Sequence, residues 1–192
     1  MDETAIFARK DEILLRDFRL SDEDSFVRWQ TIGEWRYFDA PWEGILQSLS
    51  PEQEIKIRNR FKELVSAKPE KLCKRACISL SDGTSIGYIN RYGNQRFPSV
   101  YFVGINICED QFLNLGYGTI ALQLWIEYLF QNSAARKIEI HTWSLNPRMI
   151  RVAENLGFTH EGTERELIRW QGVWQDRLRF GLLRPEWEQA KK

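Results

Sequence analysis

The sequence predicts a single α/β domain with a mixed, mostly antiparallel sheet and flanking helices. Its 192 residues, of which 43% are hydrophobic and 28% charged, suit one compact domain with a sizeable core. Two pairs of neighbouring extended runs, at residues 75–92 and 164–183, indicate antiparallel hairpins. Between them, a glycine-rich turn at residues 113–119 joins an extended run to a helical one, which is the local order of an α/β domain.

The predicted elements before this turn are an extended run, two helices and a hairpin. They cover, in order, residues 13–18, 21–30, 50–67, 75–80 and 85–92. Both helices begin with capping signals, because Ser21 and Ser50 stand where a side-chain oxygen can accept from a free helical N–H group. Pro51 and Gln53 strengthen the second signal, as first helical residue and capping-box partner. Between the helices, residues 35–42 (W-R-Y-F-D-A-P-W) are aromatic and irregular.

The elements from residue 99 onward alternate between strand and helix and end in a hairpin. They are a strand at 99–108, a helix that includes residues 122–130, a strand at 137–143, a helix at 146–157 and a hairpin at 164–183. In the second of these helices Asn146 is the expected N-cap, Pro147 the first residue and Gly157 the residue that ends it. The hairpin is expected to turn at Gln171 and Gly172.

The glycine-rich turn, L-N-L-G-Y-G-T, predicts an anion site at the start of the following helix. The first N–H groups of a helix have no intrahelical partner, and the aligned peptide dipoles leave partial positive charge beside them. Gly116 and Gly118 carry no Cβ, so a phosphate can approach these N–H groups closely. A pyrophosphate-bearing cofactor fits such a turn, although glycines before a helix also serve tight packing of a strand against a helix.

Two other phosphate-binding motifs fit the sequence less well. The Walker loop is excluded because G-x-x-x-x-G-K-[ST] occurs nowhere in the chain. Gly116, Gly118 and Ala121 match the dinucleotide fingerprint G-x-G-x-x-A, and Glu139 lies about twenty residues further on. However, Glu139 falls inside an extended run, and the about fifty residues that follow this run are too few for the rest of a doubly wound sheet.

Charge and cysteine content argue against several other classes. The 27 basic and 27 acidic side chains give a formal net charge of zero, so nothing indicates a nucleic-acid-binding surface. No run has the length of a signal peptide's apolar region, or of the roughly 20 apolar residues that span a bilayer. The three cysteines are odd in number and lack zinc-site spacing. We therefore expect a cytoplasmic protein that binds no nucleic acid, membrane or metal.

Three spaced motifs carry a resemblance to a known family. The turn at 113–119 is similar to the family pattern [QR]-x-x-G-x-[GA]. Residues 146–158 are similar to the family's helix that leads into the last strands, and read N-P-R-M-I-R-V-A-E-N-L-G-F. Residues 174–187 are similar to the family's usual ending, and read W-Q-D-R-L-R-F-G-L-L-R-P-E-W. On these motifs the chain resembles the GNAT superfamily of acetyl-CoA-dependent N-acyltransferases, and within it the ribosomal-protein N-terminal (alanine) acetyltransferase branch. The likeness covers most of the chain after about residue 75.

The resemblance implies one acyl-CoA N-acyltransferase domain over residues 1–192, with a central strand that splays from its neighbour at a bulge near Gly104. Acetyl-CoA is the implied co-substrate, without a metal, and a homodimer is allowed. Free backbone groups of the splayed strand would bind the pantetheine arm, and backbone amides of the turn would bind the pyrophosphate. Asn146 would add a side-chain amide toward the pantetheine, and it can also serve as a plain N-cap. The implied acetyl-CoA-binding residues are Ile105, Asn106, Ile107, Leu113, Asn114, Leu115, Gly116, Tyr117, Gly118, Thr119 and Asn146.

The resemblance does not supply a general acid. The tyrosine of many relatives falls at Ala153 and the serine of the nearest branch at Met149, and neither residue can protonate a leaving thiolate. Leu113 also replaces the Gln or Arg of the family pattern, which matters little for a phosphate site made of backbone amides. Either another group or water protonates the thiolate, or the chain binds acetyl-CoA with little catalysis.

Two residues are candidates for proton transfer or acceptor binding. A general base would help, because an amine attacks a thioester only when it is neutral. Glu109, just after the splayed strand, is the candidate base, unless it is simply a solvated strand end. His141 shares a strand face with Glu139 and Trp143, and lies either near the acceptor or in the sheet as a satisfied histidine.

Asp176 and three aromatic residues complete the expected acceptor side. Period-two alternation points Asp176 inward together with Trp174 and Phe180, so its carboxylate needs a structural partner or orients the substrate. The aromatic residues that can wall the acceptor pocket, or simply pack, are Trp35, Tyr37 and Trp42.

We expect an N-acetyltransferase that transfers the acetyl group of acetyl-CoA to a primary amine by direct attack. The acceptor is a protein N-terminus, a polyamine or a small-molecule amine, and the fold does not choose among them. The alternative is a catalytically weak CoA-binding module or sensor with the same fold, which Met149 and Ala153 keep open. A nicotinamide enzyme on the dinucleotide fingerprint is a third, weaker alternative.

Overall fold

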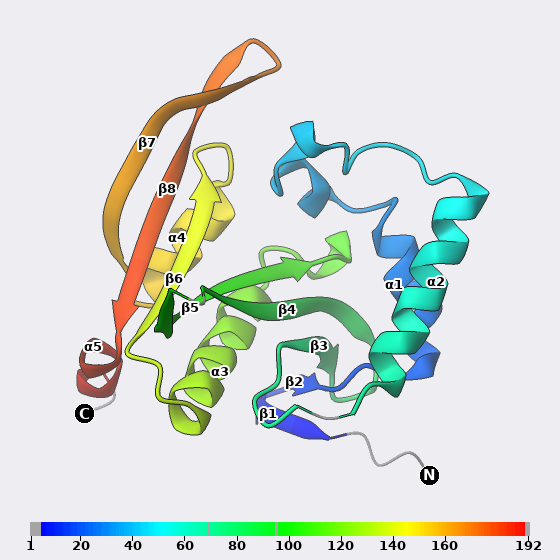
Figure 1. The fold of residues 1–192 in the computed structure, drawn as a ribbon, viewed down its shortest axis with the longest axis horizontal. Helices are drawn as coiled ribbons and strands as arrows, with labels where there is room; N and C mark the ends of the chain where they lie inside the picture. Colours follow the sequence, from blue (N-terminus) through cyan, green and yellow to red (C-terminus); the bar gives the residue numbers. More distant parts are fainter. Residues whose placement is uncertain (1–4, 69, 95, 191–192) are drawn as a thin grey trace.

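The structure is a computed structural model that describes residues 5–68, 70–94 and 96–190. In these residues eight strands form one sheet in the order β1-β2-β3-β4-β5-β6-β8-β7, and every neighbouring pair is antiparallel except β5 and β6 (Figure 1). The predicted mixed, mostly antiparallel sheet is confirmed. The strands are β1 (Ile6–Lys10), β2 (Ile13–Arg16), β3 (Arg75–Leu80), β4 (Ser85–Asn94), β5 (Phe97–Ile107), β6 (Lys137–Trp143), β7 (Thr159–Trp170) and β8 (Val173–Leu183).

Five α-helices flank the sheet in the same described residues. They are α1 (Glu23–Trp29), α2 (Pro51–Ser66), α3 (Tyr117–Asn132), α4 (Pro147–Asn155) and α5 (Arg184–Gln189), with short 3₁₀ turns at Leu20–Asp22, Glu34–Tyr37, Pro41–Glu43 and Asp110–Phe112. Two of the three predicted N-caps, Ser50 and Asn146, are confirmed; the third is wrong, because Ser21 lies inside the 3₁₀ turn before α1 and Asp22 is the N-cap residue of that helix. Ser50 Oγ accepts from the Gln53 N–H at 3.3 Å, and Asn146 Oδ1 accepts from the Met149 N–H at 3.0 Å. Gly157, at φ +79°, ends α4.

The helices cover both faces of the sheet. Successive strand residues point to opposite faces, so Ile78 packs in a core with α3 and α4, whereas its neighbour Cys77 packs in a second core with α1 and α2. Trp125 of α3 and Phe61 of α2 are fully buried at the centres of these two cores. Any ligand that lies between β5 and β6 therefore has α3 and α4 on one face of the sheet and the α1–α2 region on the other (Figure 1).

The two parallel strands, β5 and β6, diverge in the middle of the sheet. They pair only as far as Phe102 and Glu139; beyond these, β5 continues to Ile107 paired with β4, and β6 continues to Trp143 paired with β8. The splayed central strand is thus confirmed. The register of β5 against β4 runs past Gly104 without a shift, so the expected bulge there is absent from this pairing and the opening lies entirely on the β6 side.

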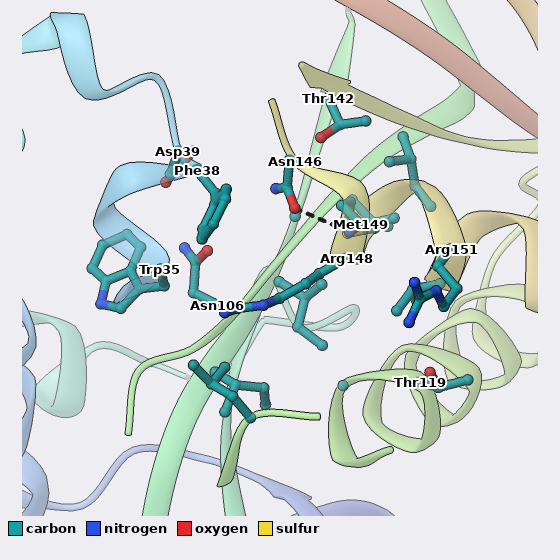
Figure 2. A pocket seen from close by; sticks show the side chains of 18 of the residues that line it. Trp35, Phe38, Asp39, Asn106, Thr119, Thr142, Asn146, Arg148, Met149 and Arg151 are labelled. Atoms are coloured by element: carbon teal, nitrogen blue, oxygen red, sulfur yellow. Dashed lines mark hydrogen bonds between the residues drawn. The ribbon is translucent and has the colours of Figure 1, made fainter. Parts of the chain in front are cut away.

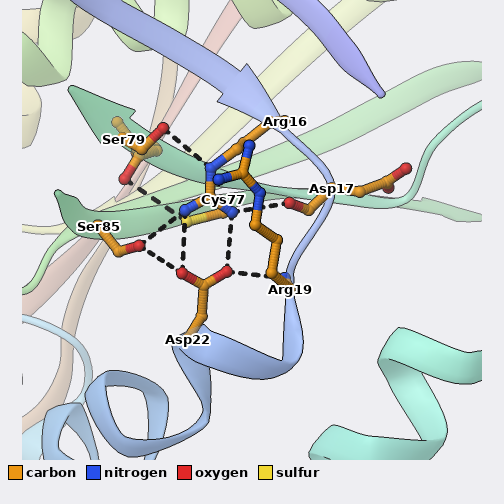
Figure 3. A network of polar contacts seen from close by, with 8 residues as sticks. Arg16, Asp17, Arg19, Asp22, Cys77, Ser79 and Ser85 are labelled. Carbon is orange, nitrogen blue, oxygen red and sulfur yellow. Dashed lines mark hydrogen bonds and ion pairs between the residues drawn. The ribbon is translucent and has the colours of Figure 1, made fainter. Parts of the chain in front are cut away.

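A buried ion pair ties β2 to the start of α1 (Figure 3). Arg16 donates to both carboxylate oxygens of Asp22, at 2.8 and 2.9 Å, and the two side chains are only 2% and 5% exposed. Ser85 Oγ donates to the same carboxylate at 2.6 Å, and Arg16 Nε donates to Ser79 Oγ at 3.1 Å. Burial alone raises the pKa of Asp22, but the hydrogen bonds from Arg16 and Ser85 outweigh it, so this pKa lies below its usual value.

The ends of the chain differ from the sequence predictions. Strand β1 and helix α5 were not expected, and β7 begins at Thr159 instead of residue 164. The turn of the last hairpin is confirmed, because Gln171 and Gly172 both have positive φ, as a tight two-residue turn requires. No helix in the described ranges is long and apolar enough to cross a membrane.

Candidate active site

A cavity of about 500 Å³ opens where β5 and β6 diverge. Its walls come from β4, β5, β6, the turn before α3, helix α4 and the connection between α1 and α2 (Figure 2). The predicted site residues that line it are Trp35, Ile105, Asn106, Ile107, Leu113, Asn114, Gly116, Tyr117, Gly118, Thr119, His141 and Asn146. The predicted residues that do not line it are Tyr37, Trp42, Glu109, Leu115 and Asp176.

The glycine-rich turn forms one end of the cavity. Gly116 is the N-cap residue of α3 and has φ +84°, and a Cβ at this position would meet nothing within 4 Å. The first N–H groups of α3, from Tyr117 onward, have no acceptor within the helix. Leu115 is 57% exposed and does not line the cavity. The end of the cavity therefore offers free N–H donors at the positive end of a 16-residue helix.

The splayed strand forms the floor of the cavity. Beyond Phe102 the backbone of β5 on its β6 side has no strand partner, and Ile105 and Ile107 lie in this stretch. A Cβ on Gly104 would lie 2.9 Å from Oδ1 of Asn90, so a larger residue here would force that amide to shift. Oδ1 of Asn90 is buried and accepts no hydrogen bond from any described residue, which leaves an acceptor free at the cavity wall.

Helix α4 forms the third wall and carries positive charge. Arg151 lines the cavity from this helix, and Thr119 lines it from α3 (Figure 2). Arg148 reaches across to the α1–α2 connection, where it pairs with Glu34 and its guanidinium lies 4.9 Å from the centre of the Phe38 ring. Met149 also lines the cavity, as expected for the position of the family's serine.

The two positions expected to hold a general acid differ in their surroundings. Met149 faces the cavity and has no ionisable group, whereas Ala153 is fully buried in the core between α4 and the sheet. Neither side chain can donate a proton. Asn146 lines the cavity while its own Oδ1 is occupied as the N-cap acceptor, so its amide NH₂ is the group that remains available.

The opposite side of the cavity holds a carboxylate that the sequence patterns did not single out. Asp39 lines the cavity from the α1–α2 connection, and it is the single carboxylate among the described lining residues. Asp39 is exposed to solvent, but the cavity wall on which it lies partly desolvates its carboxylate, and this desolvation raises the pKa of Asp39 above its usual value. The Asn106 amide partly offsets that shift, and the negative charge of Glu43 adds to it.

Aromatic residues surround this carboxylate side. Trp35, Phe38 and Tyr92 line the cavity with Asp39, and Nε1 of Trp35 is buried without a hydrogen-bond partner among the described residues. Tyr88 accepts a hydrogen bond from the Asn106 amide at 3.0 Å. This side of the cavity therefore combines one anionic group with apolar walls.

The other predicted aromatic residues have packing roles. Trp42 packs edge-to-face on Trp143, with ring centroids 4.6 Å apart, and also contacts Trp170 of the last hairpin. Trp143 in turn lines the cavity, so Trp42 supports the wall from behind. Tyr37 is 56% exposed and lies outside the lining. His141 lines the cavity with its ring on Phe102 and its Nε2 3.2 Å from Glu139.

Glu109 is held in an ion pair away from the cavity. Its carboxylate accepts two hydrogen bonds from Arg28 and one from Trp29 Nε1, the last at 2.6 Å. These partners lie on α1, and Glu109 lines only a small separate surface depression with Arg28. The structure thus gives Glu109 a role in fixing α1 to the end of β5 and does not bring it together with the cavity residues.

The predicted orientation of Asp176 is wrong in one respect. Trp174, expected on the same inward face, is 52% exposed, whereas Gln175 is buried. Asp176 is half-buried and accepts a hydrogen bond at 2.7 Å from the N–H of Glu166, a residue with φ +50°. The pairing of β7 with β8 shifts register between Glu164 and Ile168, so alternation does not hold through this part of the hairpin. The structure gives Asp176 a backbone partner in the hairpin.

Comparison with known proteins identifies the family. The model of the acetyltransferase (GNAT) domain matches residues 12–159. The SPbeta prophage-derived uncharacterized N-acetyltransferase YokL of Bacillus subtilis (strain 168) is 26% identical over 151 residues, which are 79% of this chain and 85% of that protein. The fold is also that of solved acetyltransferases. A ribosomal-protein-S5-alanine acetyltransferase from Vibrio fischeri superimposes with a TM-score of 0.73 at 17% identity, covering 97% of this chain and 99% of that one.

A second solved structure shows that this fold serves a different acceptor. Mutant forms of the spermidine/spermine N-acetyltransferase SpeG from Vibrio cholerae superimpose with a TM-score of 0.71 at 16% identity, covering 95% of this chain and 100% of that one. At such identities the likeness establishes the fold alone. The family match, which spans most of the chain, goes further: the protein belongs to the GNAT family and is an acetyltransferase, a family whose acetyl donor is acetyl-CoA.

Proposed function

We propose that this protein transfers the acetyl group of acetyl-CoA to a primary amine that enters from the α1–α2 side of the cavity. The observation that carries the proposal is the continuity of the cavity, which runs from the free N–H groups of α3, past the splay of β5 and β6, to the aromatic wall around Trp35. One opening thus joins an anion site on one face of the sheet to an apolar pocket on the other.

The residues of the α3 end suit acetyl-CoA. The pyrophosphate would accept hydrogen bonds from the N–H groups of Gly116 to Thr119, where the absent Cβ of Gly116 leaves room. The pantetheine arm would pair with free backbone groups of Ile105 and Ile107, as an added strand would. The Asn146 NH₂ group would donate a hydrogen bond to the same pantetheine arm. Acetyl-CoA supplies an acyl thioester, which the splay lets reach the middle of the sheet.

The absence of an acid at Met149 and Ala153 favours a mechanism without a side-chain proton donor on α4. In direct attack the amine nitrogen forms a bond to the acetyl carbon and keeps a proton that the departing sulfur can take. A CoA-binding module with little turnover is the second candidate, and the same two positions support it.

We propose a protein N-terminus, a polyamine or a small-molecule amine as the acceptor, and the ribosomal-protein branch as the place of this chain in the family. The branch rests on the motif at residues 146–158 and on the ending at residues 174–187. The fold neighbours act on both ribosomal protein and polyamine, by their names, so they do not choose between these acceptors.

A thiol-release assay tests the proposal. Purified protein, acetyl-CoA and a panel of amines (an Ala-initiated peptide, spermidine, glucosamine and phenethylamine) should give amine-dependent release of CoA, and calorimetry should give a saturable acetyl-CoA affinity. Binding without release for every amine would favour the module, and the absence of both would reject the proposal.

A further inference from the structure

The charges that line the cavity are arranged asymmetrically. The α3 and α4 side carries Arg151 together with the helix N-terminus, whereas the α1–α2 side carries Asp39; the guanidinium of Arg148 reaches over to this second side but is paired there with Glu34. Figure 2 shows Asp39 and Phe38 on one side of β5 and Arg151 and Thr119 on the other. An anionic ligand is favoured at the first side and a cationic one at the second, because each interacts with the opposite charge at short range.

The surroundings of Asp39 suit a protonated amine. Trp35 and Tyr92 provide aromatic rings, to which a cation is attracted, whereas the ring of Phe38 already contacts the guanidinium of Arg148. A partly desolvated carboxylate binds a cation more strongly than one in bulk water. Oδ1 of Asn90 adds a buried acceptor that no described residue uses. An ammonium has three donors, and this pocket holds unused acceptors.

The other ionisable groups around Asp39 do not neutralise it. The negative charge of Glu43, on the same connection, adds to the raised pKa of Asp39. Burial raises the pKa of Tyr88 and Tyr92 of β4, and the negative charge of Asp39 adds to this. Arg148 of α4 is paired with Glu34. Cys108, directly after β5, is buried, and on β6 the ring of His141 contacts Glu139. None of the described basic side chains bonds to the Asp39 carboxylate.

Resting on the proposed function, we propose that Asp39 binds the ammonium of the acceptor and takes one proton from it. The neutral amine then attacks the acetyl carbon, a C–N bond forms and the C–S bond breaks. The second proton leaves the nitrogen as the tetrahedral intermediate collapses and goes to the sulfur of CoA. Asp39 passes the first proton to solvent at the cavity mouth, so the step releases one proton overall.

The test compares Asp39→Asn and Asp39→Glu with Asp82→Asn. Asp82 lies in the exposed β3–β4 turn, so its substitution removes the same charge far from the cavity. Asp39→Asn keeps the shape of the side chain, and we expect kcat/KM for the amine to fall at least about 100-fold at pH 7, the lower end of general-base effects. The KM for acetyl-CoA should stay within about twofold, Asp39→Glu should recover part of the activity, and Asp82→Asn should match the wild type.

The pH profile separates proton transfer from packing. Without a base, the amine must reach the site already neutral, so the deficit of Asp39→Asn should shrink as the pH rises toward the pKa of the free amine. A constant deficit at all pH values would overturn the role as a base. A kcat/KM within about threefold of wild type, or a larger loss in His141→Asn than in Asp39→Asn, would overturn the assignment.

A binding readout keeps the inference distinct from the proposed function. In the presence of CoA, spermidine and phenethylamine should raise the melting temperature of the wild type and not that of Asp39→Asn, while CoA alone stabilises both. That pattern without any turnover would reject the proposed function and leave Asp39 as the cation-binding residue. No stabilisation of the wild type by either amine would reject the inference even if other amines turn over.

Discussion

Replacing Gly116 by Val tests the turn before α3 most directly. At φ +84° a residue with a Cβ is strained by about 1–2 kcal/mol, and a β-branched residue lies at the upper end. Since a domain of this size loses roughly 2–4 °C per kcal/mol, the melting temperature should fall by about 2–8 °C. The Cβ of the new side chain would meet no protein atom within 4 Å, so the side chain would extend into the space proposed for the pyrophosphate. CoA affinity, measured by calorimetry, should fall at least tenfold, about 1.4 kcal/mol.

Gly172→Val is the matched control for this experiment. Gly172 has φ +85°, has nothing within 4 Å of its missing Cβ, and lies in the turn of the last hairpin, outside the cavity. The same backbone strain should lower its melting temperature by a similar amount without changing CoA affinity. The reasoning is refuted if folded Gly116→Val binds CoA like the wild type, or if Gly172→Val weakens CoA equally.

Three further predictions concern the acid position and the two perturbed carboxyls. Met149→Ser should leave CoA binding intact and should not lower turnover in the thiol-release assay, and a large loss would reveal a packing role for Met149. Asp22→Asn should cost about 3–5 kcal/mol, because it leaves Arg16 buried without its partner. Because the pKa of Asp22 is lowered by folding, the pair stabilises the protein above about pH 4, the usual value, and the difference between the two melting temperatures should shrink as the pH falls below it. The pKa of Asp39 is raised instead, so the wild type gains stability as the pH falls through that pKa. Asp39→Asn should therefore melt no lower than the wild type at pH 7. Thermal melts of both proteins between pH 4 and 8 test this, and a lower melting temperature of the variant at pH 7 would contradict it.

The parts of the fold that the sequence predicts are those set by neighbouring residues. Ser50 with Gln53 and Asn146 with Pro147 mark helix starts because a cap acts within one turn of helix. The hairpin turn at Gly172 is similarly local. Strand β1 and helix α5 were missed because five and six residues are too few for a periodic pattern, and both are stabilised by tertiary contacts, for example Trp187 of α5 packed in the core under α3.

The predicted inward face of β8 holds at Phe180, which is buried, and is wrong at Trp174, which is exposed, because alternation was extended across an irregular strand pair. Period two assigns faces only while pairing is regular, and the register shift between Glu164 and Ile168 interrupts it. Glu166 adopts positive φ there, and the carboxylate of Asp176 accepts from its N–H. No local feature of the sequence marks this irregularity, since neither glycine nor proline stands between the two positions.

The candidate site also has one part that the sequence predicts and one part that depends on tertiary contacts. The turn with Gly116 and Gly118 is visible in the sequence because both the strand and the helix that flank it have periodic patterns. Asp39 is not visible, because it lies in an irregular aromatic segment and acquires its meaning only when the fold brings it to Asn106 on β5, 67 residues away by number (106 minus 39). The sequence does carry a signal for Asp39, since it is a single carboxylate among several aromatic residues. However, the sequence pattern alone does not show whether those aromatic residues line a cavity or pack in the core.

Two strained residues and two unpaired buried polar atoms lie at or beside the cavity, while others lie elsewhere in the described residues. Asn114 and Ala40 both adopt positive φ without being glycine, the first in the turn before α3 and the second directly after Asp39. Among the described residues, buried polar atoms without partners include Trp35 Nε1 and Asn90 Oδ1, and both residues line the cavity. Strain and unpaired polar groups cost stability wherever they occur, so a fold retains them where they serve binding. The Asp39 carboxylate and the free acceptor Asn90 Oδ1 suit an ammonium, whereas the free Trp35 N–H donor suits an oxygen such as a carbonyl, so an acceptor substrate that carries both kinds of group would recover in the complex the hydrogen bonds that the free protein lacks.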